Sequence, residues 1–161
     1  MESLSDLFEG QDVVLSALGP YVFGPFHSVT MYSETGKCIV EAMKKTSVDK
    51  FIVITSWCTE AAPGNPFFVE WVVKPLFIGR HLADMAVMER YLKDCQDIKF
   101  VSVRPPMLTN GAATDKEVIS VESQHNPEAK TSICRADVAR FMLDCAETDQ
   151  YDRKCVAIGV K

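Results

Sequence analysis

Two hydroxyl side chains, Thr55 and Ser56, stand near the end of an apolar, β-branched stretch at residues 50–57. A hydroxyl both donates and accepts hydrogen bonds, so this pair could bind an amide, a ribose or a reacting carbonyl. Serine and threonine hydroxyls also often satisfy nearby loop backbone. The residues alone favour neither interpretation for Ser56, which is the candidate for a catalytic role.

Two further apolar stretches end in residues that suit ligand binding. Small residues and a glycine after residue 15 would let a flat ligand approach the backbone closely. Arg104 could hold a phosphate or pair with a carboxylate, and pairing is favoured. The two prolines after it stop a strand in either case. The candidate cofactor-binding residues at the three stretch ends are Leu18, Gly19, Thr55, Ser56, Arg104, Pro105, Pro106 and Met107.

Strand-like and helix-like stretches alternate along the chain, which predicts a single α/β domain over residues 1–161. Strands are predicted at residues 12–18, 50–57, 99–104 and 154–160. Helical spacing predicts helices at residues 30–45, 79–94 and 135–148. The strands are almost continuously apolar, as strands covered on both faces of a parallel sheet must be. The expected fold is therefore a Rossmann-type doubly wound parallel sheet in three αβα layers, with ligands at the carboxyl ends of its strands.

Two longer irregular regions, residues 20–29 and 59–78, interrupt the pattern. Residues 67–73 are apolar and aromatic and are read as a short helix or a lid, although core packing is the favoured alternative. If this segment faces the site, a planar ligand would lie over Trp57, Phe67 and Phe68.

The composition of the chain excludes several classes of binding partner. The chain has 161 residues and a net charge of −5, which argues against nucleic acid or an anionic membrane surface as a partner. No apolar run is long enough to span a bilayer, and the first residues do not resemble a secretory signal. The six cysteines form no Cys-x-x-Cys pair and the three histidines lie in different segments, so no metal site is expected. Reduced thiols and a cytoplasmic location are the default expectation.

A glycine-rich phosphate turn is missing. The sequence holds no Gly-x-Gly-x-x-Gly motif, which would place backbone N–H groups and a helix N-terminus against a pyrophosphate. The spacing from Gly19 to Gly24 does not serve, because Pro20 and Pro25 remove donors there.

Taken together, residues 9–19, 48–56 and 100–106 resemble strand segments of atypical short-chain dehydrogenase/reductases of the NmrA-like, NAD(P)H-binding group. Residues 133–143 and 149–152 most resemble the branch of NADPH-dependent flavin reductase and biliverdin-IXβ reductase. The resemblance covers nearly the whole chain. It implies a Rossmann domain that uses NADPH, or NADH, to reduce a planar acceptor such as a flavin or a linear tetrapyrrole, with Ser56 beside the nicotinamide.

The chain departs from this family in two places. Met107 stands where the biliverdin reductase has a histidine, which puts a proton-relay role in doubt. Family members also begin with a β-α-β-α-β portion that carries the phosphate turn, and this portion is expected to be lacking here. Two alternatives to a reductase therefore stay open: a non-catalytic nucleotide-binding or sensor module, and an inactive truncated product.

The same comparison of strand order makes the strand from Asp12 to Leu18 an open sheet edge. Such an edge presents unpaired backbone groups. The chain is therefore expected to be unstable in isolation or to self-associate through this strand.

Overall fold

A five-stranded sheet forms the centre of the molecule. The computed structural model describes residues 3–19 and 29–161, so the predicted loop around Pro20, Gly24, Pro25 and His27 lies outside the described residues. The strands, in spatial order, are β1 (Val13–Ser16), β2 (Lys50–Ile54), β3 (Lys99–Arg104), β7 (Lys154–Val160) and β5 (Val118–Val121). The four strands predicted from the sequence are parallel to one another, as expected. The fifth, β5, was not predicted and runs antiparallel to β7.

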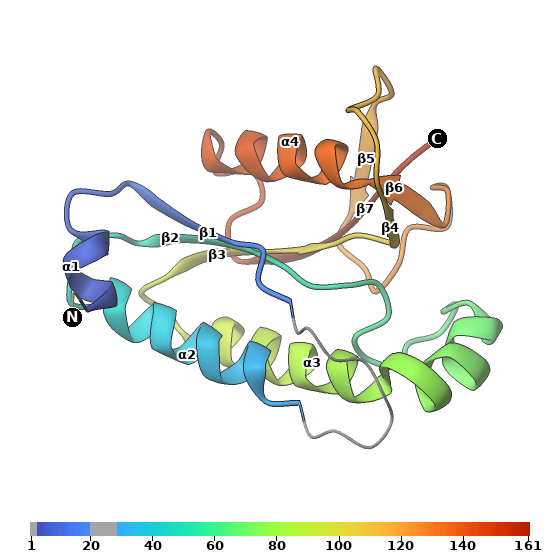
Figure 1. Cartoon of the computed structure of the whole chain (residues 1–161), viewed down its shortest axis with the longest axis horizontal. Coiled ribbons are helices and arrows are strands. Elements are labelled where there is room, and N and C mark those ends of the chain that lie inside the picture. Colours follow the sequence, from blue (N-terminus) through green and yellow to red (C-terminus); the bar gives the residue numbers. More distant parts are fainter. Residues whose placement is uncertain (1–2, 20–28) are drawn as a thin grey trace.

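Helices cover both faces of this sheet. Helices α2 (Met31–Met43) and α3 (Gly79–Asp94) lie on one face and α4 (Arg135–Ala146) lies on the other, while the short α1 (Leu4–Phe8) precedes β1 (Figure 1). The predicted doubly wound, three-layer αβα architecture is therefore confirmed. No helix in the described part of the chain is long and apolar enough to cross a membrane.

The continuous apolar strands serve two cores. Phe51 and Val53 of β2 belong to the core that contains Val40, Met88 and other side chains of α2 and α3. Ile52, between them, belongs to the core with α4. Side chains of a strand alternate between its faces. An inner strand between two helical layers must therefore be apolar at every position.

Two segments without a clear strand pattern form a second, small sheet. Strands β4 (Met107–Thr109) and β6 (Ser132–Cys134) pair in parallel just beyond the end of β3. The prolines at 105 and 106 do end β3, but the chain continues into β4 after only two residues. Strands of three residues carry too short a pattern to be recognised from sequence.

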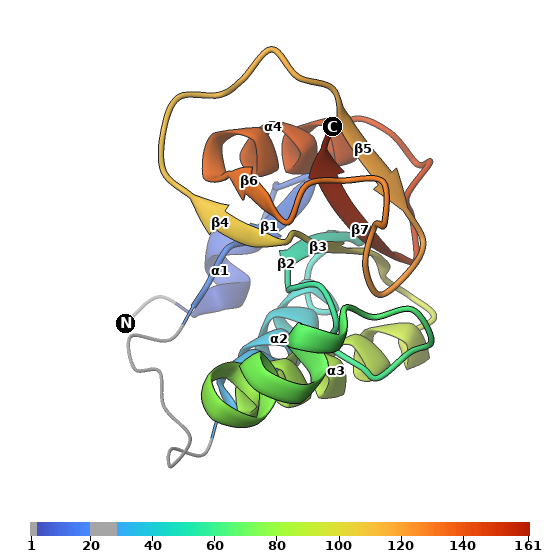
Figure 2. The ribbon, with the colours of Figure 1, turned by 90° about the vertical axis from the view of Figure 1, so that its right-hand side faces the viewer.

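The aromatic segment is helical and exposed. Residues Val69–Ile78 form a π-helix, η1, which leads directly into α3 (Figure 2). None of its residues is buried, so the favoured interpretation of this segment as core packing is wrong and the helix is confirmed. A side chain on Gly79 would come within 2.6 Å of the Lys74 carbonyl oxygen, so the junction of the two helices requires glycine.

A buried carboxylate holds the two helices of one layer together. Asp84 of α3 accepts hydrogen bonds from the backbone N–H groups of Tyr32, at 2.8 Å, and Ser33, at 3.3 Å. These N–H groups lie in the first turn of α2, where a helix leaves donors without internal partners and favours a negative charge.

Replacing Asp84 with Asn should lower the free energy of unfolding by about 1–2 kcal/mol, because the charged acceptor at the start of α2 is lost. Urea denaturation of Asp84→Asn and the unchanged protein would measure this. The matched control is Asp94→Asn, which replaces an exposed aspartate at the end of α3. It should leave the free energy of unfolding unchanged. Equal stability of Asp84→Asn and the unchanged protein would contradict the assignment.

The predicted self-association through β1 stays a prediction. Strand β1 is an edge of the sheet, and no described residue pairs with its outer side. Leu15 is 40% exposed on it. Because a lysine on an edge strand opposes edge pairing, Leu15→Lys should weaken association about tenfold or more in sedimentation velocity runs over a range of concentrations. Leu143→Lys, an exposed leucine of α4, should change nothing. A sample that is monomeric at every concentration would refute the prediction.

Candidate functional site

The carboxyl ends of β1, β2 and β3 meet at one edge of the sheet. Register pairs Ser16 of β1 with Val53 of β2, and Ile54 of β2 with Val103 of β3. The ladder continues past β2, because the Thr55 N–H donates to the Val103 carbonyl at 2.8 Å and the Trp57 N–H to that of Pro105 at 3.0 Å. Ser56 is therefore held beside Pro105.

Four of the predicted cofactor-binding residues are accessible at this edge. Ser56 is half-buried, and Gly19 is exposed. Leu18 is 52% exposed and Met107 69% exposed. These residues combine one hydroxyl with apolar or small neighbours. Such a surface suits a flat ring that carries a polar substituent.

The other predicted cofactor-binding residues are buried. Thr55, Pro105 and Pro106 have little contact with solvent, and Arg104 is 3% exposed. The Arg104 guanidinium donates to both oxygens of Glu89, with Nε 2.9 Å from Oε1 and Nη2 2.6 Å from Oε2. The favoured pairing with a carboxylate is therefore confirmed. The guanidinium is therefore paired inside the protein and is not exposed at the edge of the sheet.

Glu89 is the centre of a buried polar cluster. Its Oε1 also accepts from Thr55 Oγ1 at 3.0 Å and from Ser102 Oγ at 2.6 Å, and its Oε2 accepts from Thr59 Oγ1 at 2.9 Å. Burial raises the pKa of this carboxyl, but the hydrogen bonds and charge of Arg104 and the two closest hydroxyls outweigh it. The net pKa lies below its ordinary value of 4.5, so the carboxylate is ionised at neutral pH.

The cluster also fixes a second loop. Gln124 Oε1 accepts from the Glu60 N–H at 3.1 Å and lies 3.1 Å from Thr59 Oγ1, whose single proton points to Glu89. Its carbonyl oxygen accepts from the Cys58 N–H at 2.7 Å. Arg104 donates to the Ser123 carbonyl at 2.8 Å. The turn after β2 is thus attached to the loop after β5.

Trp57 does not offer an open face to a ligand. It is 8% exposed, packs with Cys58 and Ala157, and donates from its indole nitrogen to the Ile158 carbonyl at 3.1 Å. The His125 ring packs against it in a T-shaped arrangement, with ring centroids 6.1 Å apart. The expectation that a planar ligand lies over Trp57 is therefore corrected: this side chain belongs to the core.

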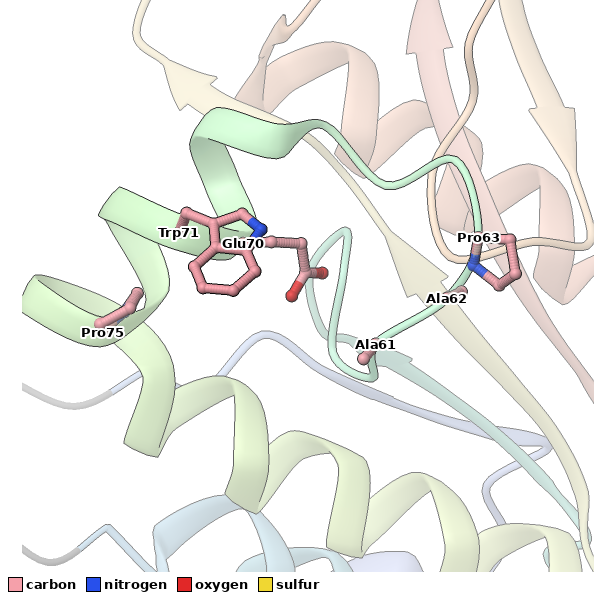
Figure 3. Close-up of a pocket in the computed structure, with 6 residues that line it drawn as sticks. All are labelled: Ala61, Ala62, Pro63, Glu70, Trp71 and Pro75. Carbon is pink, nitrogen blue, oxygen red and sulfur yellow. The ribbon is translucent and has the colours of Figure 1, made fainter.

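Phe67 and Phe68 are accessible, at 74% and 65% exposed. Phe67 stacks on Trp71, with ring centroids 5.8 Å apart, and Trp71 is 70% exposed. Next to this stack is a hollow of about 590 Å³ between η1 and the loop that leaves β2 (Figure 3). The hollow is lined by Ala61, Ala62, Pro63, Glu70, Trp71 and Pro75.

One polar group enters this apolar hollow. The Glu70 carboxylate accepts from Lys74 Nζ at 2.6 Å and from Asn65 Nδ2 at 2.5 Å. Burial raises its pKa, but these two hydrogen bonds and the lysine charge bring it below the ordinary value. Glu70 is thus an ionised, internally paired group at the rim of an aromatic surface.

Sequence reasoning missed Glu89 and the side of the hollow formed by residues 61–63. A pattern that could have revealed Glu89 is its place on the apolar stripe of α3, four residues after Met85 and three before Leu92. A charge on a buried stripe is rare unless it is paired. In the described part of the chain, no three His, Cys, Asp or Glu side chains gather as metal ligands would.

A family model described as NAD(P)H-binding matches residues 1–149. The chain therefore belongs to the NAD(P)H-binding family, and its resemblance to atypical short-chain dehydrogenase/reductases is confirmed.

Solved structures agree on the fold. The chain is similar to the oxidoreductase YlbE of Lactococcus lactis (TM-score 0.74, 16% identity, covering 98% of this chain and 65% of that one). It is also similar to a short-chain dehydrogenase/reductase of Veillonella parvula, solved in complex with NADP (0.71, 17%, 97% and 66%). A third is a Streptococcus pneumoniae protein provisionally named an NADH-flavin reductase (0.72, 17%, 99% and 76%). The chain spans about two thirds of the first two and three quarters of the third.

Removing one partner of the buried Glu89–Arg104 pair should strongly destabilise the folded protein. Arg104→Met should lower the free energy of unfolding by about 3–5 kcal/mol, because it leaves the Glu89 carboxylate buried without its counter-charge. The double variant Arg104→Met, Glu89→Gln removes that charge while keeping an acceptor for the hydroxyls. It should recover at least half of the loss in urea denaturation. A double variant that is no more stable than Arg104→Met would contradict the pairing argument.

Proposed function

We propose that this chain is an NAD(P)H-dependent reductase of the flavin or biliverdin reductase type. The nicotinamide end of the cofactor would lie at the carboxyl edge of the sheet, and a planar acceptor would lie beside it. The observation that carries the proposal is the half-buried Ser56 hydroxyl, held at this edge between accessible Leu18, Gly19 and Met107 in a chain of the NAD(P)H-binding family.

The residues at the edge suit a nicotinamide ring. Gly19 lets the ring approach the backbone, Leu18 and Met107 offer apolar contact, and the Ser56 hydroxyl can hydrogen-bond the carboxamide or the reacting atom. The nicotinamide supplies a hydride when bound. The contribution of this chain would be to orient the ring and exclude water, because Met107 has no proton to give.

In this proposal, fewer residues form the acceptor site than the sequence suggested. Since Trp57 is buried, the planar acceptor would lie on the exposed Phe67 and Phe68, with Trp71 and the hollow beside them. Aromatic faces stack well on flat conjugated rings. This chemistry supports a flavin or tetrapyrrole acceptor and does not distinguish between them. NADPH and NADH also stay equal candidates.

A second candidate function is a non-catalytic nucleotide-binding or sensor module. It is favoured by Met107, which replaces a proton donor with a thioether, and by the lack of a glycine-rich turn in the sequence. In this case the cofactor would bind at the same edge and no acceptor would be reduced. We place either function in the cytosol, which the six free cysteines support.

The experiment uses reduced nicotinamide mononucleotide as the probe, alongside NADPH and NADH, because it contacts only the nicotinamide end. Binding is followed by saturation-transfer NMR, and NADPH oxidation by absorbance with FMN or biliverdin present. Ser56→Ala should weaken binding of the mononucleotide about threefold to tenfold, the worth of one hydrogen bond. Ser47→Ala, an exposed serine outside the edge, is the matched control and should bind like the unchanged protein.

The outcomes separate the candidates. Binding with acceptor-dependent oxidation supports the reductase. Binding without oxidation supports the sensor module. Failure of all three nucleotides to bind the folded protein overturns the proposal.

A further inference from the structure

We propose that Glu89 is a positioning residue: its carboxylate holds the turn at residues 55–60 in the shape that presents Ser56 to a ligand. The inference rests on the proposed function for the role of Ser56. The placement of Glu89 itself rests on geometry alone.

The carboxylate joins three segments: helix α3, the turn after β2 and strand β3. It accepts from Thr55 and Thr59 on either side of Ser56, from Ser102 of β3, and twice from Arg104 at the end of β3. Glu89 itself is 1% exposed and belongs to α3. Five hydrogen bonds satisfy both oxygens, so a displacement of the carboxylate would break several contacts at once.

The turn at residues 55–60 needs these contacts because its backbone is strained at one residue. Cys58 has a φ of 59°, in the left-handed region that side chains other than glycine and asparagine seldom adopt. Strain of this kind persists only where surrounding contacts overdetermine the conformation. Here the contacts are the Thr55 and Thr59 hydroxyls on Glu89 and the Cys58 N–H on the Gln124 carbonyl.

Arg104 fixes the orientation of the Glu89 carboxylate. A planar guanidinium bound to both carboxylate oxygens fixes the orientation of the carboxylate as well as its position. The same guanidinium donates to the Ser123 carbonyl, next to Gln124. A small rotation of Glu89 would therefore shift both the turn and the loop that supports it.

The experiment separates positioning from general stability. Glu89→Gln and Thr59→Val each remove part of the contacts that hold the turn, whereas Thr59→Ser keeps the hydroxyl. Asp84→Asn is the matched control, because it removes another buried carboxylate of α3 without touching the turn. Each variant is tested below its thermal transition, with reduced nicotinamide mononucleotide as the probe and amide hydrogen exchange at Trp57 and Cys58 as a second readout.

The expected result is a tenfold or greater rise in the dissociation constant for Glu89→Gln and about threefold for Thr59→Val. Thr59→Ser and Asp84→Asn should stay within twofold of the unchanged protein. Exchange at Trp57 and Cys58 should accelerate in Glu89→Gln by at least tenfold more than exchange at strand β3 amides, and should not do so selectively in Asp84→Asn.

Two failures are distinguishable. If the unchanged protein does not bind the probe, the proposed function fails, and the exchange data decide whether Glu89 holds the turn. If the unchanged protein binds and folded Glu89→Gln binds equally well, or if Asp84→Asn weakens binding as much, the positioning role of Glu89 is overturned.

Discussion

The buried ion pair between Glu89 and Arg104 connects the layers of this protein at the edge where its parallel strands end. Glu89 comes from the helix that covers one face of the sheet, and Arg104 is the last residue of β3. Taking two charges out of water is costly, and apolar residues in their place would often be as stable. What an apolar pair could not do is accept hydrogen bonds from Thr55, Ser102 and Thr59. The pair is thus better explained by the conformation it imposes on the strand ends than by stability.

The fold was largely predictable because its rules are local and repetitive. A strand covered on both faces must be apolar throughout, as Phe51, Ile52 and Val53 illustrate, and this pattern is visible without a structure. The short strands β4, β5 and β6 were not predictable in the same way. Each is defined by its partner: Val118 is in a strand because it lies opposite Val160. Three or four residues do not encode that pairing by themselves.

The candidate site was predictable in position and not in detail. Parallel strands bring Ser56, Leu18 and the prolines after Arg104 to one edge whatever the side chains are. Which of them a ligand can reach depends on long-range partners. The guanidinium of Arg104 is held inside the protein by Glu89, a helix residue fifteen positions earlier. The Trp57 indole is held there by a hydrogen bond to the Ile158 carbonyl. Trp57 and the equally aromatic Phe67 look alike in sequence, yet one is core and the other is 74% exposed.

The division between accessible and buried residues also explains how this edge can combine rigidity with an open surface. Successive residues of an extended chain face opposite ways. Because the Thr55 side chain points toward Glu89, the next side chain, Ser56, points away from the cluster. The backbone then enters the left-handed conformation at Cys58, which lets Thr59 return to the same carboxylate. One anion thus holds the residues on both sides of Ser56 and leaves that hydroxyl available. A flexible loop bearing the same serine would lose entropy on binding that this turn has already lost on folding.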